Sequence, residues 1–318
     1  MNHLARALLS HERIAVITHV SPDGDTLGSA LAIRRALLSL GKRAIVVCQD
    51  KMPEMYRFMP DADGVLLPDA VPFAPDCAMF VDVAAPERAG TALALALSAP
   101  CQLLLDHHET NVGFVPDFVV DGGASSVGEL AVELIDTLGV PLDAQMATQI
   151  FIAIATDTGN FGFSCTTPAA MRTVARCLEA GLEIDEISRR LFRLRTVPRT
   201  RLIGTGLSAM ERHHDGQIAI TKLTREMLAN CGALPEDTEG LINYLNEMEG
   251  VEACCLAVER ENGTKCSLRS SGKVDVGAVA FAFGGGGHKV AAGVTIALPI
   301  DEAADKLLDA LRQTIGAR

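Results

Sequence analysis

A histidine and two aspartates stand close together directly after an apolar run near the N-terminus. Residues 14–17 have the composition of a buried strand, and His19, Asp23 and Asp25 follow them. Two carboxylates at the end of a buried strand are unfavourable unless a positive charge neutralises them. A divalent cation is the simplest such partner, so the motif predicts a metal site.

Acidic and imidazole residues recur at the ends of later apolar runs. Asp82 ends one run, Asp106 and His107 end another, and Asp157 follows an apolar helical segment. Ligands bind outside the carboxyl ends of the strands in an open parallel sheet, so these side chains are expected at one edge. The candidate metal ligands are His19, Asp23, Asp25, Asp82, His107 and Asp157. Such an oxygen-rich set with some imidazole suits Mn²⁺ or Mg²⁺, with two ions sharing a carboxylate.

The elements that must position these residues alternate between strands and helices. Nearly continuous apolar runs predict buried parallel strands at residues 13–20, 43–48, 77–83, 101–105 and 118–120. Helical patterns with capping residues cover residues 26–40, 126–138 and 144–155. The first part of the chain is therefore predicted to be an α/β domain with a doubly wound, mostly parallel sheet.

The pattern changes to hairpins in the last third of the chain. Asp215-Gly216 and Asn262-Gly263 predict tight turns between strands, and a terminal helix is expected at residues 301–313. This indicates a smaller α/β domain with a mixed sheet. The expected organisation is a catalytic metal-binding domain at 1–187, a linker at 188–205 and a substrate-binding domain at 206–318.

A glycine-rich segment in the second domain is the candidate anion site. Gly284 to Gly287 leave the backbone N–H groups bare, and a short helix is expected directly after them, with its positive end toward the anion. Arg269 and Ser270 end a hairpin strand and are expected to meet the same ligand. The predicted substrate-binding residues are Arg269, Ser270, Gly285, Gly286, Gly287 and His288.

The overall composition argues against several kinds of partner. A net charge of −12 disfavours sequence-blind binding of long duplex DNA. No apolar run reaches the roughly 18 residues of a membrane span, and the N-terminus lacks a signal-peptide layout. The nine cysteines form no C-x-x-C pair, which favours buried thiols in a reducing compartment over a zinc site. A cytoplasmic protein without membrane contact is expected.

Together these motifs resemble those of the DHH phosphoesterase superfamily. The resemblance covers nearly the whole chain, and its spacing is most similar to the bacterial branch of bifunctional oligoribonucleases (nanoRNases) and pAp phosphatases. The matching N-terminal motifs are His19-x-x-x-Asp23-x-Asp25-x-x-Gly28-Ser29, Asp82, Asp106-His107-His108 and Asp157. In the second domain, Gly284-Gly-Gly-Gly287-His288-x-x-Ala291-Ala292-Gly293 is similar to the signature of the DHH-associated domain.

The resemblance implies two Mn²⁺ ions per active site, with Mg²⁺ or another divalent cation as the alternative. It implies one ion held by His19, Asp23 and Asp82, and a second held by Asp25, Asp82, His107 and Asp157. It further implies two catalytic residues. Asp106 would orient His107, and His108 would lie near the scissile phosphate as a donor. The glycine-rich region would hold the terminal phosphate or nucleotide of the substrate.

The implied function is hydrolysis of short oligoribonucleotides to mononucleotides, and of pAp to AMP. One alternative is a phosphodiesterase acting on a cyclic dinucleotide, such as cyclic di-AMP, or on its linear product. Another is a nucleotide-binding regulator without catalysis. The resemblance also suggests a homodimer, which no residue of the sequence indicates by itself.

Overall fold

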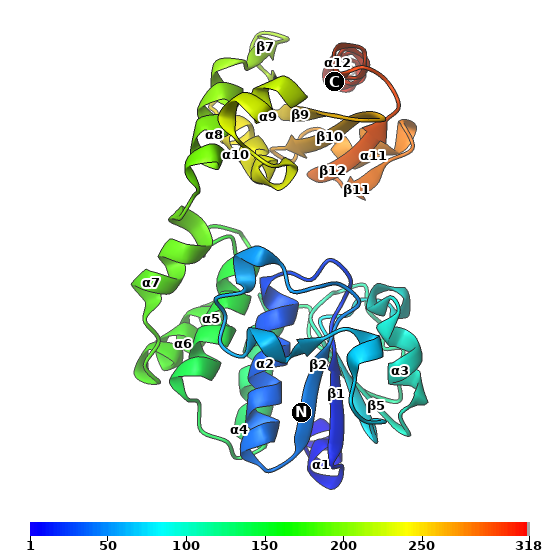
Figure 1. Ribbon diagram of the computed structural model, residues 1–318, viewed down its shortest axis with the longest axis vertical. Helices are drawn as coiled ribbons and strands as arrows, with labels where there is room; N and C mark the ends of the chain where they lie inside the picture. Colours follow the sequence, from blue (N-terminus) through cyan, green and yellow to red (C-terminus); the bar gives the residue numbers. More distant parts are fainter. Residues whose placement is uncertain (317–318) are drawn as a thin grey trace. The chain divides into compact units, whose positions relative to one another are not determined.

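The computed structural model describes residues 1–316, which form two compact units (Figure 1). The first unit is Met1–Leu194, and the second begins at Arg195. This division falls within the linker expected at residues 188–205. Much of that segment is helical, because α8 (Val197–Ser208) begins there with Pro198 in its first turn. A proline is well tolerated at this position, where its missing N–H would have no helical partner.

The first unit is built around a six-stranded parallel sheet in the order β3-β2-β1-β4-β5-β6. The strands are β1 (Arg13–Ile17), β2 (Arg43–Val47), β3 (Val65–Leu66), β4 (Cys77–Val81), β5 (Cys101–Asp106) and β6 (Asp117–Val120). The direction in which successive strands are added reverses between β1 and β4. The predicted doubly wound fold is therefore confirmed, and the β1–β4 boundary is the switch point at which such sheets bind ligands.

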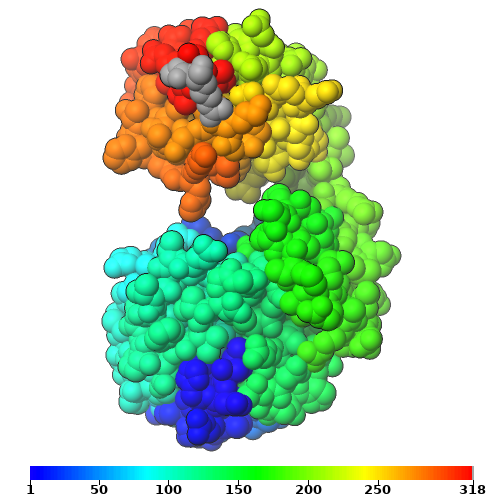
Figure 2. Space-filling view, turned by 180° about the vertical axis from the view of Figure 1, so that it is seen from behind, coloured from blue at the N-terminus to red at the C-terminus, as the bar shows by residue number. Residues whose placement is uncertain are grey.

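Helices cover both faces of this sheet, and Figure 1 shows α2, α4 and α5 on the face opposite to α3. The helices of the unit are α1 (Asn2–Ser10), α2 (Gly24–Ser39), α3 (Ala92–Ser98), α4 (Val127–Thr137), α5 (Ala144–Asp157), α6 (Pro168–Glu179) and α7 (Ile184–Ser188), followed by a π-helical turn at Arg189–Arg193. Short 3₁₀ turns lie at Glu54–Tyr56, Ala62–Gly64, Pro68–Ala70 and Pro86–Ala89. Figure 2 shows α1 as a dark-blue patch on the surface of the unit, beside green residues of the middle of the chain.

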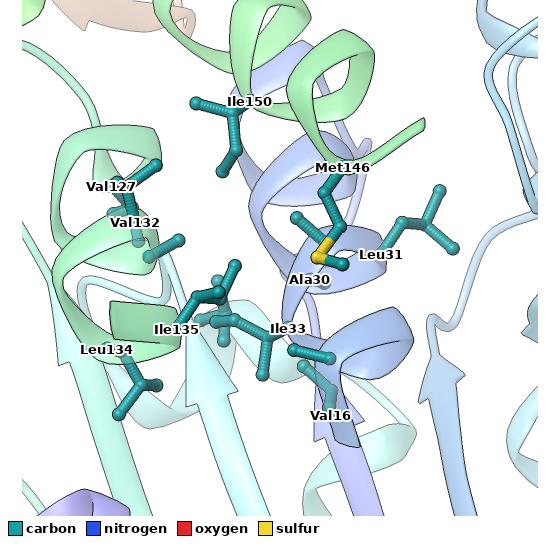
Figure 3. Packing of buried hydrophobic residues seen from close by; sticks show 14 of the residues in the cluster. Val16, Ala30, Leu31, Ile33, Val127, Val132, Leu134, Ile135, Met146 and Ile150 are labelled. Carbon is teal, nitrogen blue, oxygen red and sulfur yellow. The ribbon is translucent and has the colours of Figure 1, made fainter. Parts of the chain in front are cut away.

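The hydrophobic core between α2 and the sheet holds in place the start of α2, which carries two of the candidate metal ligands. Figure 3 shows side chains of α2, α4 and α5, such as Ile33, Ile135 and Ile150, gathered over Val16 of β1. Gly28 lets α2 approach α5 closely, because a Cβ at this position would lie 2.3 Å from the carbonyl oxygen of Gln149. The start of α2, which carries two candidate ligands, is thus fixed by backbone-to-backbone contact.

The second unit contains a six-stranded mixed sheet in the order β11-β12-β10-β9-β8-β7, in which only β8 and β9 run parallel. Its strands are β7 (Glu211–His213), β8 (Ile218–Leu223), β9 (Ala253–Arg260), β10 (Gly263–Ser270), β11 (Gly286–His288) and β12 (Ala291–Ile296). The helices are α8, α9 (Arg225–Cys231), α10 (Leu241–Asn246), α11 (Val276–Ala282) and α12 (Ile300–Gly316), with a 3₁₀ turn at Pro235–Thr238. The mixed sheet and both predicted hairpins are confirmed.

The end of the glycine-rich segment is itself part of a strand pair, so the prediction of a helix directly after Gly287 is wrong. Gly286–His288 forms β11, which pairs antiparallel with β12. Gly287 has φ of +145°, and a Cβ there would lie 2.5 Å from the carbonyl oxygen of Ala291. Glycine is thus required for close strand pairing, and no helix N-terminus faces an anion at this point.

Within residues 1–316, none of the helices combines the length and the apolar character that crossing a lipid bilayer requires.

Candidate metal centre

The six predicted metal ligands gather at the carboxyl edge of the parallel sheet, around the switch point between β1 and β4. His19 follows β1, Asp82 directly follows β4, and His107 directly follows β5. Asp23 is the N-cap of α2, and Asp157 is the last residue of α5. A cavity of about 240 Å³ opens among them. It is lined by His19, Asp23, Asp82, Ala84, Arg88, His107, His108 and Asp157.

His19, Asp23 and Asp82 form one group whose ligand atoms lie within 4.8 Å of one another. Nε2 of His19 is 3.6 Å from Oδ1 of Asp23 and 3.5 Å from Oδ2 of Asp82. Nδ1 of His19 lies 2.9 Å from the carbonyl oxygen of Val20, to which it can donate its proton. This bond leaves the Nε2 lone pair directed to the carboxylates, as in imidazoles that bind metals.

Asp25, His107 and Asp157 form a second group of the same size. Nε2 of His107 is 3.6 Å from Oδ2 of Asp25 and 3.3 Å from Oδ2 of Asp157. Its Nδ1 lies 3.1 Å from the carbonyl oxygen of Ala124, so this ring is oriented by the same kind of backbone bond as His19. The first group is the first ligand set that the family resemblance implies. The second group is the second implied set without Asp82, the residue that both sets share.

Asp82 lies between the two groups and faces both. Oδ2 is the oxygen nearest to His19, and Oδ1 is 3.7 Å from Nε2 of His107. Oδ1 is buried and has no hydrogen-bond partner among the described residues. The backbone of Asp82 adopts φ of +60°, which aspartate tolerates better than most residues at the end of a strand. An unpartnered buried carboxylate oxygen is unfavourable in a protein interior unless a cation binds it.

The charges of the site are unbalanced in the protein alone. Asp25 is 1% exposed, and burial together with the charges of Asp82 and Asp157 raises its pKa well above the usual range. Burial and the charge of Asp82 also raise the pKa of Asp157 to about 6, against the opposing charge of His107. Burial alone would lower the pKa of His19, but the carboxylates of Asp23 and Asp82 outweigh it and raise that pKa to about 10. Without cations, the site therefore keeps extra protons, and these neutralise part of the charge of the carboxylates.

The residues present therefore fit divalent cations. Separations of 3.3–3.7 Å between these ligand atoms are longer than ordinary hydrogen bonds. Ligands that are each about 2.1 Å from one cation lie roughly 3 to 4 Å apart, which matches these separations. Four carboxylates and two imidazoles suit Mn²⁺ or Mg²⁺ rather than a thiophilic metal.

The position of Asp25 depends on the start of another helix. Its carboxylate accepts the backbone N–H groups of Val127 at 2.8 Å and Gly128 at 3.2 Å, together with the Ser29 hydroxyl at 3.0 Å. Ser126 caps α4 by accepting the N–H of Gly128, and the carboxylate of Glu129 accepts the N–H of Ser125. The N-terminus of α4 is thus built around a metal-ligand candidate.

Asp106 bonds His108, and the expectation that it orients His107 is wrong. Oδ1 of Asp106 lies 2.8 Å from Nδ1 of His108, whereas Nδ1 of His107 faces the carbonyl of Ala124. Neighbouring residues after a strand project in different directions, so the carboxylate of Asp106 bonds the ring of the second histidine. Asn111 donates to Oδ2 of Asp106 at 2.6 Å and completes its environment. Burial alone would raise the pKa of Asp106, but the bonds from His108 and Asn111 lower it.

Arg88 also lines the cavity, and sequence reasoning missed it. It lies in the short 3₁₀ turn Pro86–Ala89 after β4, and one of its guanidinium nitrogens is 3.3 Å from Nδ1 of His19. The carbonyl of Arg88 accepts the N–H of Val20 at 2.7 Å, which ties the loops after β1 and β4 together. The sequence signal that could have indicated Arg88 is its position six residues after Asp82, in the loop at the same edge of the sheet.

In the second unit, Arg269 and His288 flank one small residue across three strands. Both are paired in register with Ala291, Arg269 from β10 and His288 from β11. Directly paired residues of antiparallel strands project from the same face of the sheet. Strands lie about 4.8 Å apart, so roughly 10 Å separates the two backbones, with a methyl group between them. A cationic and an imidazole side chain thus lie on the same face of the sheet, on either side of Ala291.

Ser270 does not share that space. It follows Arg269 directly, so its side chain projects from the opposite face of β10. It is 5% exposed, and its hydroxyl oxygen accepts the N–H groups of Gly272 at 3.0 Å and Val274 at 3.2 Å. Ser270 therefore shapes the turn after β10, and the expectation that it meets the same ligand as Arg269 is not supported by the sheet geometry.

The two units match two protein-family models. Residues 13–154 match the N-terminal domain of the DHH family, and residues 216–317 match the DHHA1 domain.

Known proteins resemble the chain along its length. A Thermus thermophilus protein named bifunctional oligoribonuclease and PAP phosphatase NrnA is 35% identical over 308 residues, which are 95% of this chain and 90% of that protein. The crystal structure of an exopolyphosphatase-related protein from Bacteroides fragilis has a TM-score of 0.91 at 27% identity, and the match covers 98% of this chain and 95% of that one. RecJ from Thermus thermophilus, solved in complex with Mn²⁺, shares the fold at a TM-score of 0.57 and 15% identity over 100% of this chain and 54% of its own.

Proposed function

Because the chain belongs to the DHH family and carries a DHHA1 domain, we propose that it is a metal-dependent phosphoesterase that hydrolyses short oligoribonucleotides to mononucleotides. The observation that carries the proposal is the pair of ligand groups on either side of Asp82. The activities for which the Thermus relative is named, oligoribonuclease and PAP phosphatase, support the choice of substrate. We propose the removal of phosphate from pAp as a second activity of the same centre.

The residues would hold two divalent cations, for which Mn²⁺ is our first choice. His19 and Asp23 would bind one ion, Asp25, His107 and Asp157 the other, and Asp82 both. Held by these residues, the two cations would lower the pKa of a bound water and would stabilise charge on the attacking and leaving oxygens of a phosphoryl transfer. The backbone bonds at Nδ1 of His19 and His107 keep both Nε2 atoms available for this role.

His108 is proposed to donate a proton or a hydrogen bond to the phosphate ester. Its side chain is 43% exposed at the cavity, and its bond to Asp106 raises its pKa, which favours the protonated donor. Asp106 positions the ring and balances its charge. Arg88 adds a second cationic group at the same cavity and would bind a non-bridging phosphate oxygen.

The second unit is proposed to supply a phosphate-binding site. Arg269 and His288 border the space above Ala291, and they would bind a terminal phosphate between them. The exposed backbone of Gly286 and Gly287 lies in the same strand as His288 and offers further N–H donors. Both oligoribonucleotides and pAp carry a phosphate besides the one that is cleaved, so one anion site would serve both substrates.

The main rival activity is hydrolysis of a cyclic dinucleotide or its linear product.

A nucleotide-binding regulator without catalysis is the other alternative. It would have no use for Asp25, a carboxylate that is kept almost fully buried beside two others. That cost is understandable only if the site holds cations.

A substrate panel tests the proposal. The metal-free full chain is reloaded with Mn²⁺ and given labelled di- to pentaribonucleotides, pAp and cyclic di-AMP, and products are followed over time. We expect mononucleotides from the linear ribonucleotides and AMP from pAp, with the dinucleotide cleaved at least about 10-fold faster than cyclic di-AMP, a difference of about 1.4 kcal/mol in barrier height. Preferential cleavage of cyclic di-AMP would favour the rival activity. Tight nucleotide binding without turnover would favour a regulator.

A further inference from the structure

From the geometry at the opposite end of the parallel sheet, we propose a second kind of metal site, formed by His11, Cys77 and Cys101, that binds a thiophilic cation of the Zn²⁺ class. One ring nitrogen of His11 and both sulfurs lie within 4.8 Å of one another. The site is independent of the proposed catalytic activity, because its residues lie at the amino ends of the strands and the catalytic candidates lie at the carboxyl ends.

The two sulfurs have the separation that a shared cation needs. Cys77 and Cys101 are the first residues of β4 and β5 and are paired directly in register. Their Sγ atoms are 3.5 Å apart. Two thiolates bound to a tetrahedral Zn²⁺ at about 2.3 Å lie roughly 3.8 Å from each other, so binding requires only a small adjustment.

His11 is held in the orientation of a metal ligand. It is the C-cap residue of α1, and its Nδ1 lies 2.7 Å from the carbonyl oxygen of Ala7. A neutral ring that donates from Nδ1 keeps its lone pair on Nε2. The same arrangement is found at His19 and His107 in the candidate metal centre, where a backbone carbonyl also receives Nδ1.

The donor set selects the class of cation. Two sulfurs and one imidazole suit Zn²⁺, whereas Mn²⁺ and Mg²⁺ prefer oxygen ligands. Asp76, the acidic neighbour of Cys77, is committed to Arg13, whose backbone N–H it accepts at 2.8 Å. Three protein ligands therefore remain, and a tetrahedral cation bound by them would take water as its fourth ligand. His11 and Cys101 are only half-buried. Sequence spacing could not indicate this site because its ligands come from three separate segments.

The proposed site also predicts how binding would depend on pH. Burial raises the pKa of Cys77 and of Cys101, so both thiols stay protonated in the absence of a cation. Binding must then release protons, and the affinity must rise with pH. The site would also fasten the end of α1 to two central strands. That helix is otherwise held by buried apolar residues such as Leu4 and Leu8.

Cobalt serves as the probe, because sulfur ligands give Co²⁺ a near-ultraviolet charge-transfer absorption that oxygen and nitrogen ligands do not. The experiment uses the full chain with Cys165→Ser. Cys165 is exposed, and its sulfur lies 3.6 Å from the carbonyl oxygen of Asp157, so it could supply a sulfur ligand at the other metal centre. The carboxylate-rich centre is first saturated with Mn²⁺. We expect about one equivalent of Co²⁺ to produce the band, and Zn²⁺ to remove it by competition.

Variants locate the site. Cys101→Ser should abolish the band. His11→Ala should weaken Co²⁺ binding at least about 10-fold, because loss of a ligand should cost no less than loss of a group that only orients one. Cys266→Ser is the matched control, because Cys266 lies against Cys255 in a buried thiol pair of the second unit, and it should leave the band unchanged. Circular dichroism confirms that each variant is folded. No band in the Cys165→Ser chain, or a band that persists in a folded Cys101→Ser variant, would overturn the proposal.

Discussion

The 2.8 Å hydrogen bond between Asp106 and His108 joins a fully buried carboxylate to a half-exposed imidazole at the edge of the metal-ligand cavity. The carboxylate is held by Asn111 on its other side. The bond raises the pKa of His108, because it stabilises the protonated ring. His108 therefore stays a donor to a higher pH than an isolated histidine would.

Replacing Asp106 tests this relationship. Asp106→Asn removes the charge but keeps the shape, so the pKa of His108 should fall and the protonated ring should be lost at lower pH. We expect kcat to fall about 10- to 100-fold, the range found when the partner of a functional histidine is removed. The basic limb of the pH–rate profile should also move to lower pH. An unshifted profile with normal Mn²⁺ content would show that Asp106 only supports the fold.

Arg88 is expected to act on the substrate phosphate without holding a cation. Arg88→Gln should lower kcat/KM about 10²-fold, the scale of losing one charged donor to the transition state, with unchanged Mn²⁺ content. Arg57→Gln is the control, since Arg57 is an exposed arginine paired with Glu54 outside the cavity. Loss of bound Mn²⁺ in Arg88→Gln would instead assign Arg88 to the support of His19.

Arg269 and His288 of the second unit should act on binding rather than on chemistry. Arg269→Ala and His288→Ala are each expected to raise the KM for a diribonucleotide about 10-fold or more, because each removes a charged or polar contact to phosphate. Lys265→Ala is a matched control, since Lys265 projects from the same face of β10 four residues earlier. Steady-state kinetics separates the cases, and an equal effect of all three substitutions would argue for general charge attraction.

Stability without metal should fall as the pH rises through the carboxylate range. The pKa of Asp157 is about 6 in the folded chain against an ordinary 3.8, so the folded state holds more protons between these values. The unfolding free energy therefore decreases as pH rises from about 4 to about 6. Bound Mn²⁺ takes the place of the proton, so the increase in Tm on adding Mn²⁺ should be larger at pH 7 than at pH 5.

Asp157→Asn provides the check on that reading. The amide cannot ionise, so the decline in Tm of the metal-free variant between pH 4 and pH 6 should be shallower than that of the parent chain. Thermal unfolding at a series of pH values measures both curves. Parallel curves would place the pH dependence in other groups.

Much of the architecture was predictable because it follows from local patterns. Apolar runs that end in His19, Asp82 or His107 mark both the strands and the edge that they share. The directions in which neighbouring side chains project at the end of a strand were not predictable, because they depend on where the backbone turns. Asp106 was therefore assigned to the wrong histidine, and Ser270 was expected to meet the ligand of Arg269 although it projects from the opposite face of β10.

Long-range contacts account for the remaining differences. The glycines before His288 were interpreted as the approach to a helix, but they permit close pairing with β12. Arg88 reaches the cavity through a 3₁₀ turn that has no strong sequence signature. The proposed thiol site combines α1 with the starts of two strands, a combination that only the three-dimensional arrangement reveals.

The central claim is a phosphoesterase centre in which two cations share Asp82. The most direct test measures the turnover of a labelled diribonucleotide against the amount of Mn²⁺ bound per chain. We expect little turnover up to about one ion per chain, a rise as the second ion binds, and a maximum at about two. Asp82→Asn should remain folded and show no turnover at any Mn²⁺ loading. Full turnover with a single ion, or an active Asp82→Asn variant, would contradict the account.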